Sequence, residues 1–414
     1  MKKLLKNRGR LKWFTDARFG MFIHWGIYSI PARGEWHLNH SGMDRDEYER
    51  YAGEFNPVSF DPESWAELAW NAGMRYVVFT TKHHDGFCMF DSVNNDFKIT
   101  NSPYGKDITR ELVEAFRRRG LGIGFYHSLV DWRHPHFIPD PEHPEWKRGT
   151  RDFSGRDIRI YRKYLYEHVE QLLSDYGKID ILFFDYTSKY KNASEWEAEK
   201  LLDLVYSLQP EIIVNDRLSH EKKSLLGDYC TPEISLPNAP ISIGQEQAWE
   251  TCMTLNDNWG YSAVDDSWKT PSTVIQALVH CVSMNGNLLL NVGPDATGKI
   301  PDRAARILGE VAGWMKYASP SIHGACMAET KAPYPHYYTQ NGERLFLHLT
   351  CSPMGDIILP EDDGIKSARY LKDRSEVQII THWGKELLKK DELRIRPGFS
   401  SADSILNTIE LRRD

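Results

Sequence analysis

An aspartate stands at the end of a short apolar run in the middle of the chain. Residues 181–184 are Ile-Leu-Phe-Phe, and Asp185 follows them directly. A run of this length that is rich in Ile and Phe is typical of a strand buried on both faces of a parallel sheet. Asp185 could cap the next turn, as acids after strands often do, or it could take part in a reaction. Polar residues at the ends of other strands decide between these roles.

Polar side chains end most of the other predicted strands as well. In chain order, with Asp185 included, the residues at the strand ends are His24 and Trp25 with Glu35 and Trp36 just beyond, His83, His84 and Asp85, Tyr126 and His127, Asp185, Asn215, Asp216 and Arg217, Glu233, Glu250 and Asn291. Each of them alone could have a structural role, such as a hydrogen-bonded histidine or an Asp–Arg ion pair. Because the strand interiors are apolar and the ends are polar, the pattern predicts one shared polar pocket.

Metal-assisted hydrolysis is one chemistry that such a pocket could support. Its ligands would be His24, His83, His84 and Asp85. However, adjacent residues project in opposite directions from a regular strand, which separates the two neighbouring histidines. The sequence also contains no HExxH motif. The spacing therefore disfavours a metal site.

Glycoside hydrolysis by two carboxylates is the other chemistry. One acid attacks the anomeric carbon or activates water, and the second protonates the leaving oxygen. Asp185 is placed to act as the nucleophile, and Glu233, from the sixth predicted strand, could approach it. A separation of about 5 to 5.5 Å between the two carboxyl groups is expected for a double displacement. The His, Arg, Trp and Tyr residues would then bind sugar hydroxyls and an apolar sugar face.

These residues need a scaffold that brings strand ends together. We predict eight strands, at residues 20–27, 76–83, 121–128, 179–185, 211–216, 228–233, 250–255 and 287–293. Helical segments with clear starts lie between several of them, beginning at Asp61-Pro62, Asp107 and Thr270-Pro271. This rhythm predicts an α/β fold with a (β/α)8-like, TIM-type barrel, whose active site lies at the carboxyl ends of the strands. A doubly wound open sheet is the alternative, but no GxGxxG motif follows a strand.

The last part of the chain has a different pattern. After about residue 330, short alternating segments are separated by Gly, Pro and charged turns, as in an antiparallel β-sandwich. We therefore expect a catalytic barrel over residues 1–330 and a C-terminal β-sandwich over residues 331–414.

Composition narrows the range of partners and locations. The net charge of −7 argues against a nucleic-acid partner or an anionic membrane surface. No run of about 18 apolar residues is present to span a bilayer, and the basic N-terminus never reaches the apolar core of a signal peptide. The six cysteines form no CxxC pair, so we expect free thiols and a reducing compartment. A cytoplasmic protein is expected, or a secreted one if a leader has been removed.

Taken together, the motifs resemble those of the α-L-fucosidases of glycoside hydrolase family 29. The resemblance spans the chain and is carried by FIHWG (22–26), GEWH (34–37), TTKHHDGFCMFDS (80–92), FYHSLVDW (125–132), LFFD (182–185), IIVNDR (212–217), TPE (231–233), WETCMTLNDNWGY (249–261) and GNLLLNVGPDATGKIP (286–301). It implies a retaining exo-hydrolase that releases terminal α-L-fucose from fucosylated glycans through a covalent fucosyl-enzyme, without a metal or organic cofactor.

The resemblance also implies roles for single residues. The family nucleophile falls on Asp185, and the acid/base falls on Glu233 by its spacing after NDR, with Glu250 as the competitor. The fucose-binding positions fall on His24, Glu35, Trp36, His83, His84, Tyr126, His127 and Arg217. The chain departs from the family pattern at Tyr186, where a Gly is frequent. A non-catalytic fucose-binding protein is a further alternative, but it would need neither Asp185 nor Glu233.

Overall fold

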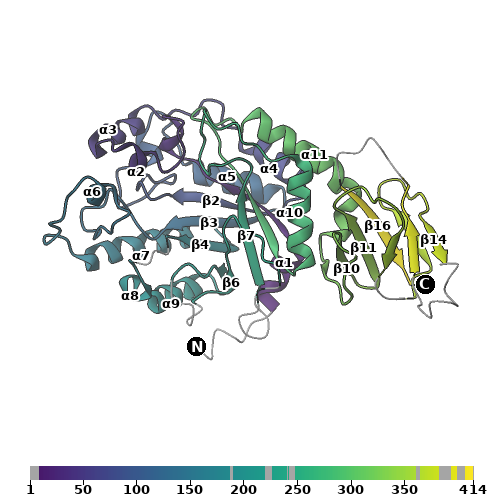
Figure 1. Ribbon diagram of the computed structural model, residues 1–414. Coiled ribbons are helices and arrows are strands. Elements are labelled where there is room, and N and C mark those ends of the chain that lie inside the picture. The colour runs from purple at the N-terminus through teal and green to yellow at the C-terminus, as the bar shows by residue number, and fades with distance from the viewer. Residues whose placement is uncertain are drawn as a thin grey trace.

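The computed structural model describes residues 9–186, 190–219, 226–239, 241, 248–359, 364–381, 393–398 and 406–413. They form a barrel domain followed by a smaller β-domain, which lie side by side in Figure 1. No helix in the described part of the chain is both long and apolar enough to cross a membrane. All six cysteines are unpaired, as expected from their spacing.

The barrel contains all eight predicted strands. They are β1 (Phe19–Ile23), β2 (Tyr76–Lys82), β3 (Gly122–Ser128), β4 (Ile181–Asp185), β5 (Ile213–Val214), β6 (Tyr229–Cys230), β7 (Ala248–Thr254) and β8 (Asn287–Val292). Their order in the sheet is β5-β4-β3-β2-β1-β8-β7-β6, and each strand is parallel to its neighbours in this order. A parallel bridge from Asn215 to Tyr229 joins the two edges. The predicted (β/α)8-like barrel is thus confirmed.

Helices surround this sheet (Figure 1). The longer ones are α1 (Gly9–Ala17), α4 (Pro62–Asn71), α5 (Ile108–Arg118), α7 (Ile158–Asp175), α9 (Ala198–Leu208), α10 (Pro271–Ser283) and α11 (Asp302–Ala318). Short helices α2 (His37–Ser41), α3 (Arg45–Glu49), α6 (Pro144–Lys147) and α8 (Ala193–Trp196) lie in the loops, with 3-10 turns at Ile27–Ser29, Arg50–Gly53, Ile99–Asn101 and Ser319–Ser321. The described residues between β5 and β7 form no helix.

The expected helix starts are present as N-caps. Asp61 accepts hydrogen bonds from the backbone N–H groups of Glu63 and Ser64 at the start of α4. Asp107 caps α5, and Thr270 caps α10 ahead of Pro271. These side chains satisfy backbone donors that have no partner within the helix, and so they fix where each helix begins.

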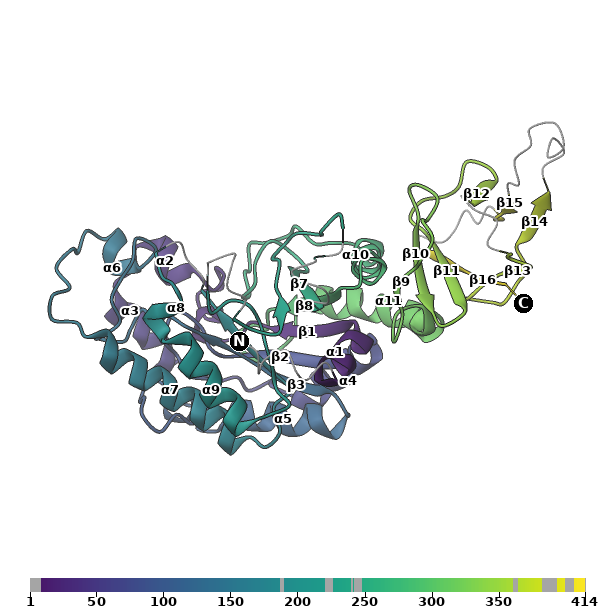
Figure 2. The same ribbon diagram turned by 90° about the horizontal axis from the view of Figure 1, so that it is seen from below.

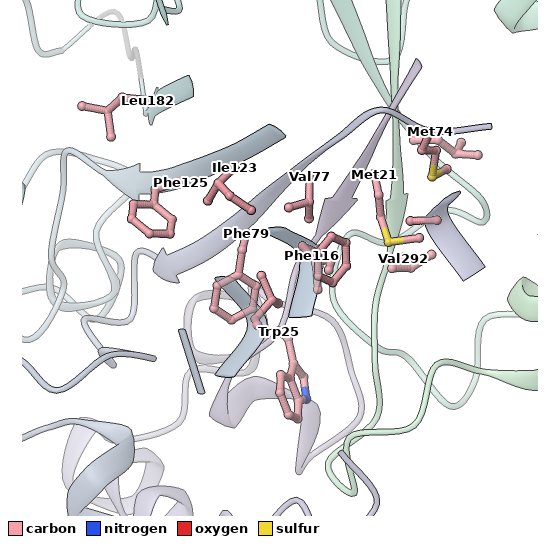
Figure 3. Close-up of a cluster of buried hydrophobic side chains, with 14 of the residues drawn as sticks. Met21, Trp25, Met74, Val77, Phe79, Phe116, Ile123, Phe125, Leu182 and Val292 are labelled. Carbon is pink, nitrogen blue, oxygen red and sulfur yellow. The ribbon is translucent and has the colours of Figure 1, made fainter. Parts of the chain in front are cut away.

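Side chains alternate across the barrel strands and fill two separate cores. Val77, Phe79, Ile123 and Phe125 point outward and pack against helices, with Phe116 of α5 among their neighbours (Figure 3). The alternate residues of the strands point inward and fill the barrel, including Tyr76, Val78, Tyr126 and Phe183. This alternation has a period of two residues, so it decides which residue at each strand end faces the barrel axis.

The β-domain is made of two antiparallel sheets, as predicted (Figure 2). Its strands are β9 (Cys326–Met327), β10 (Tyr337–Asn341), β11 (Arg344–Leu349), β12 (Ile357–Leu359), β13 (Ser367–Tyr370), β14 (Gln378–Thr381), β15 (Leu393–Arg396) and β16 (Asn407–Arg412). The sheet orders are β13-β16-β11-β10-β9 and β12-β15-β14. The first strand, β9, already pairs with β10, just before the proposed domain boundary at residue 330.

The β-domain is held against the last helices of the barrel. Trp314 of α11 is buried and donates a hydrogen bond from Nε1 to the carbonyl oxygen of Leu406 at 2.9 Å. Thr339 of β10 donates to the carbonyl oxygen of Ser321 at 2.8 Å. Figure 1 shows this domain at one end of the molecule and α2, α3 and α6 at the other.

Candidate active site

Asp185 ends β4 at the carboxyl end of the barrel and lies in a network of polar side chains. Its Oδ1 accepts a hydrogen bond from Nη1 of Arg217 at 2.6 Å. Its Oδ2 accepts one from the hydroxyl of Tyr126 at 2.7 Å and lies 3.8 Å from Nε2 of His84. The side chain is 18% exposed, so the carboxyl is reached from the barrel opening and is not sealed in the core.

The surroundings of Asp185 keep it ionised. Burial raises the pKa of a carboxyl group, and it is the largest influence here. Arg217, His84 and the Tyr126 hydroxyl act in the opposite direction, and together they lower the pKa to about 2. An unprotonated carboxylate at neutral pH is what a nucleophile requires.

Arg217 connects Asp185 to a second acid. Its Nη2 lies 2.8 Å from Oε2 of Glu233, while Nη1 binds Asp185. Nε of Arg217 donates to Oγ1 of Thr231 at 3.1 Å, and the guanidinium lies over the ring of Phe183 at 5.1 Å. The Glu233 side chain is 42% exposed. The two acids therefore face each other across one guanidinium group, and the second is open to solvent.

Three buried histidines form one side of the site. Nδ1 of His24 is 2.8 Å from Oδ1 of Asn291, and Nδ1 of His84 is 2.6 Å from the hydroxyl of Ser128. The ring of His83 stacks on Tyr126 with a centroid distance of 5.6 Å. Burial is the main cause that lowers the pKa of all three, to about 3 for His24 and about 4 for His84. They are neutral at pH 7, and each offers one donor and one acceptor.

Glu35 and Trp36 reach the site from the loop after β1. Trp36 packs edge-on against His84, with ring centroids 5.3 Å apart. Glu35 is buried and accepts a hydrogen bond from the backbone N–H of Gly260 at 2.7 Å. Burial raises the pKa of Glu35, and the Gly260 N–H opposes this shift. Both residues therefore join the group that the sequence predicted.

Tyr126 and His127, which are neighbours on β3, lie on opposite faces of the sheet. Tyr126 points into the barrel and binds Asp185. His127 is fully buried on the outer face, where its Nδ1 lies 3.1 Å from the hydroxyl of Thr81. Its ring packs against His168 of α7 at 5.5 Å. The structure does not bring His127 together with the other expected sugar-binding residues.

Glu250 also lies apart from the other candidates. It is paired in register with Asn287, the first residue of β8, and its carboxyl accepts a hydrogen bond from the hydroxyl of Tyr76, the first residue of β2. The amino-terminal ends of these strands form the closed end of the barrel. Burial raises the pKa of Glu250 to about 8. The competitor to Glu233 is therefore a buried carboxyl that is neutral at pH 7 and lies towards the amino-terminal ends of the strands.

Several residues at the site were not singled out from the sequence. Trp259 packs on His24 with a centroid distance of 5.0 Å, and its carbonyl oxygen accepts a hydrogen bond from Asn291. Trp132 packs against both Trp36 and His84. Both tryptophans lie in loops inside the motifs FYHSLVDW and NDNWGY. An aromatic residue soon after a barrel strand was the available signal for them.

A metal centre finds no support in this arrangement of side chains. Within the described ranges, no three His, Cys, Asp or Glu side chains are grouped so that they could hold an ion. The Nδ1 atoms of His24 and His84 are already hydrogen-bonded to Asn291 and Ser128.

Comparison with known proteins gives a consistent result. Residues 2–319 match the family model described as "Alpha-L-fucosidase". The chain is 32% identical to the tissue alpha-L-fucosidase of Homo sapiens over 347 residues, which covers 78% of this chain and 71% of that protein. It is 29% identical to the alpha-L-fucosidase of Dictyostelium discoideum over 341 residues, covering 76% of this chain and 71% of that protein.

Solved structures are similar over nearly the whole chain. Alpha-L-fucosidase isoenzyme 1 from Paenibacillus thiaminolyticus superposes with a TM-score of 0.92 at 42% identity, covering 97% of this chain and 98% of that chain. A trapped covalent intermediate of an alpha-L-fucosidase from Bacteroides thetaiotaomicron, in complex with 2-fluoro-fucosyl fluoride, gives a TM-score of 0.83 at 26% identity. This second match covers 98% of this chain and 96% of that chain.

Proposed function

The chain belongs to the alpha-L-fucosidase family, and from this premise we propose that it hydrolyses terminal α-L-fucosides with retention, using Asp185 as nucleophile and Glu233 as acid/base. One observation carries the assignment of roles. Asp185 and Glu233 both bind the guanidinium of Arg217, whereas Glu250 lies at the closed end of the barrel. The substrate is a fucosylated oligosaccharide or glycoconjugate.

The first half of the reaction forms a covalent intermediate. An oxygen of Asp185 attacks the anomeric carbon of fucose while the bond from that carbon to the glycosidic oxygen breaks. Glu233 transfers its carboxyl proton to the departing oxygen, which leaves as an alcohol. Arg217 can stay bound to Glu233 beforehand, because a protonated carboxyl keeps an acceptor oxygen.

The second half releases fucose. Glu233, now a carboxylate, removes a proton from a water molecule as the water oxygen attacks the anomeric carbon. The bond to Asp185 breaks and its carboxylate is restored. Two inversions give net retention. The neutral histidines and Trp36 would bind the hydroxyls and the apolar side of the sugar, with Glu35 as a further acceptor.

Azide rescue separates the roles of the two acids. An Asp185→Ala enzyme lacks the nucleophile, so azide should restore turnover of an aryl fucoside and give β-fucosyl azide. Glu233→Ala should keep activity on substrates with good leaving groups, and azide should give α-fucosyl azide because the covalent step is intact. Glu250→Ala, the control, should show no rescue. Rescue in the Glu250 variant and none in the Glu233 variant would overturn the assignment.

The alternatives make different predictions. A fucose-binding protein without catalysis would bind fucose but release no aryl group from an aryl α-L-fucoside. A metal-dependent hydrolase would lose activity on exhaustive chelation, whereas we expect full activity. A cytoplasmic location is part of the proposal, since all six cysteines are unpaired and free thiols are typical of reducing compartments. Cell fractionation tests it.

A further inference from the structure

The residue after the proposed nucleophile has an unusual backbone conformation. Tyr186 has a φ of 78°, which lies in the left-handed region that Gly adopts freely and bulky residues rarely enter. Tyr186 is also largely buried, with 9% of its surface exposed. Strained backbone of this kind persists only where the surrounding contacts impose it. The contacts of the Tyr186 side chain should therefore show what the conformation achieves.

One contact is a hydrogen bond to a fixed acceptor. The Tyr186 hydroxyl donates to Oδ1 of Asp140 at 2.9 Å. Asp140 is 4% exposed and lies in the loop between β3 and α6. The same Oδ1 accepts a hydrogen bond from the backbone N–H of Glu142 at 2.9 Å, which fixes its position. The end of the Tyr186 side chain is thus tied to a neighbouring loop.

The second contact is with His84. The Tyr186 ring lies edge-on to the His84 imidazole with centroids 5.2 Å apart. Trp36 and Trp132 also pack against this imidazole, each at 5.3 Å. Three aromatic rings and the hydrogen bond to Ser128 therefore hold His84, whose Nε2 lies 3.8 Å from Asp185.

The backbone conformation explains how Tyr186 reaches this place. On a regular strand, residues 185 and 186 would point to opposite faces of the sheet. The positive φ interrupts this alternation, and Tyr186 meets the same histidine that lies beside Asp185. A glycine would adopt the conformation without strain, but it has no side chain to reach Asp140.

We propose that Tyr186 is a positioning residue, whose hydrogen bond to Asp140 keeps its ring against His84 and so keeps His84 directed at Asp185. This inference rests on the proposed function of the site. It assigns a purpose to the position at which the chain departs from the family pattern.

The consequence should be visible in the acid limb of the pH profile. The groups that influence the charge of Asp185 are Arg217, His84, the Tyr126 hydroxyl and the backbone N–H of Tyr186, with His24 and Cys252 nearby. Arg217 and then His84 are the main groups that lower the pKa of Asp185 against burial. If His84 turns away, this pKa rises, and the acid limb of kcat/KM moves to higher pH.

The experiment compares Tyr186→Phe, Asp140→Ala and the double variant on an aryl α-L-fucoside. The phenylalanine keeps the ring and removes the hydroxyl that donates to Asp140. Each single change should lower kcat/KM about ten-fold, as expected for one lost hydrogen bond to a charged group. The double variant should lose less than the sum of the two single losses, because each single change already removes the bond that they share. Tyr166→Phe is the matched control, since the Tyr166 hydroxyl donates to the carbonyl oxygens of Trp196 and Glu197, away from the site.

A second measurement does not depend on turnover. The imidazole of His84 should titrate at higher pH by NMR in Tyr186→Phe than in the wild type. Burial is the largest influence on its pKa of about 4, and loosening that burial should outweigh the weaker attraction to Asp185. An unchanged His84 titration, an unchanged acid limb or additive losses in the double variant would overturn the inference. A wild type that fails to hydrolyse any fucoside would overturn the proposed function, and the titration would still test this contact.

Discussion

At the level of single residues, the charge of Asp185 depends on Arg217 more than on any other group that favours ionisation. The guanidinium binds Oδ1 at 2.6 Å, and both side chains are largely buried. When one partner of such a pair is removed, the other charge is left without compensation in a poorly solvated place. Arg217 should therefore matter for the charge of Asp185, the proposed nucleophile, in addition to any contact with the sugar.

Arg217→Gln should therefore impair the reaction even with small, activated substrates. We expect kcat/KM to fall at least about 100-fold, which corresponds to roughly 3 kcal/mol for a broken buried ion pair. The acid limb should also move to higher pH, since burial then raises the pKa of Asp185 with less opposition. Arg162→Gln serves as the control. Arg162 forms an ion pair with Glu197, with Nη1 2.6 Å from Oε1, and this pair lies away from the site. Equal activities in the two variants would contradict this role.

Glu250 gives a prediction about stability, because burial raises its pKa to about 8. In the unfolded chain a glutamate titrates near 4.5. The folded protein therefore binds one more proton than the unfolded chain between these values, and its stability falls as pH rises from about 4.5 through about 8. Glu250→Gln cannot ionise, so its free energy of unfolding should decline less over this range. Denaturation curves at several pH values test this; parallel declines in both proteins would refute it.

The sequence was informative about which strand ends carry polar groups, but not about which way each side chain points. His24, His83, His84, Asp185 and Arg217 were found from their places after apolar runs. His127 and Glu250 satisfied the same criterion and lie elsewhere, because the facing of a residue depends on register within the strand. Both β3 faces are buried, so neither face of that strand is marked by exposed polar residues.

At the level of elements, the strands whose interiors are continuous apolar runs were located within a few residues. β5 and β6 are shorter than predicted, at two residues each. The chain passes very close to itself here: Gly227 has a φ of 145°, and a Cβ at this position would overlap the carbonyl oxygen of Asn215. Such a close approach is a tertiary property, so local propensity could not shorten these strands in advance.

A buried ion pair connects β2 to the loop after β3 beside the site. Nζ of Lys82 is fully buried, lies 3.4 Å from Oδ2 of Asp131 and donates to the carbonyl oxygen of Val130 at 3.1 Å. Lys82→Met would leave the aspartate buried without its cation, and we expect a loss of about 3 to 5 kcal/mol in the free energy of unfolding. Lys98→Met should lose less than about 1 kcal/mol, because its partner Asp91 is exposed. Equal losses in the two variants would show that burial does not strengthen the pair.

At the level of the whole molecule, the two domains share a buried contact. Trp314 of α11 is 1% exposed and bonds to Leu406 in the β-domain. The alternating pattern after residue 330 predicted the sandwich, but no local pattern indicated which helices it would pack against. Contacts between distant segments depend on how the finished surfaces fit.

Trp314→Ala should destabilise the protein by about 3 to 5 kcal/mol, as for other large buried aromatic side chains. The kcat of the folded fraction should stay close to that of the wild type, because the contact lies on α11 and not at the strand ends. Trp70→Ala, at a side chain that is 39% exposed, should change stability by less than about 1 kcal/mol. A lower kcat at full folding would show that the β-domain influences the barrel opening.

The guanidinium shared by two acids has a consequence for electroneutrality during turnover. In the proposed cycle, the trio begins as one carboxylate, one guanidinium and one protonated carboxyl, so its formal charges cancel. In the proposed covalent intermediate the carboxylate has become an ester and the second acid has lost its proton, and the charges cancel again. Negative charge thus passes from one side of Arg217 to the other while the total stays constant, so no counter-ion has to enter or leave with each half-reaction.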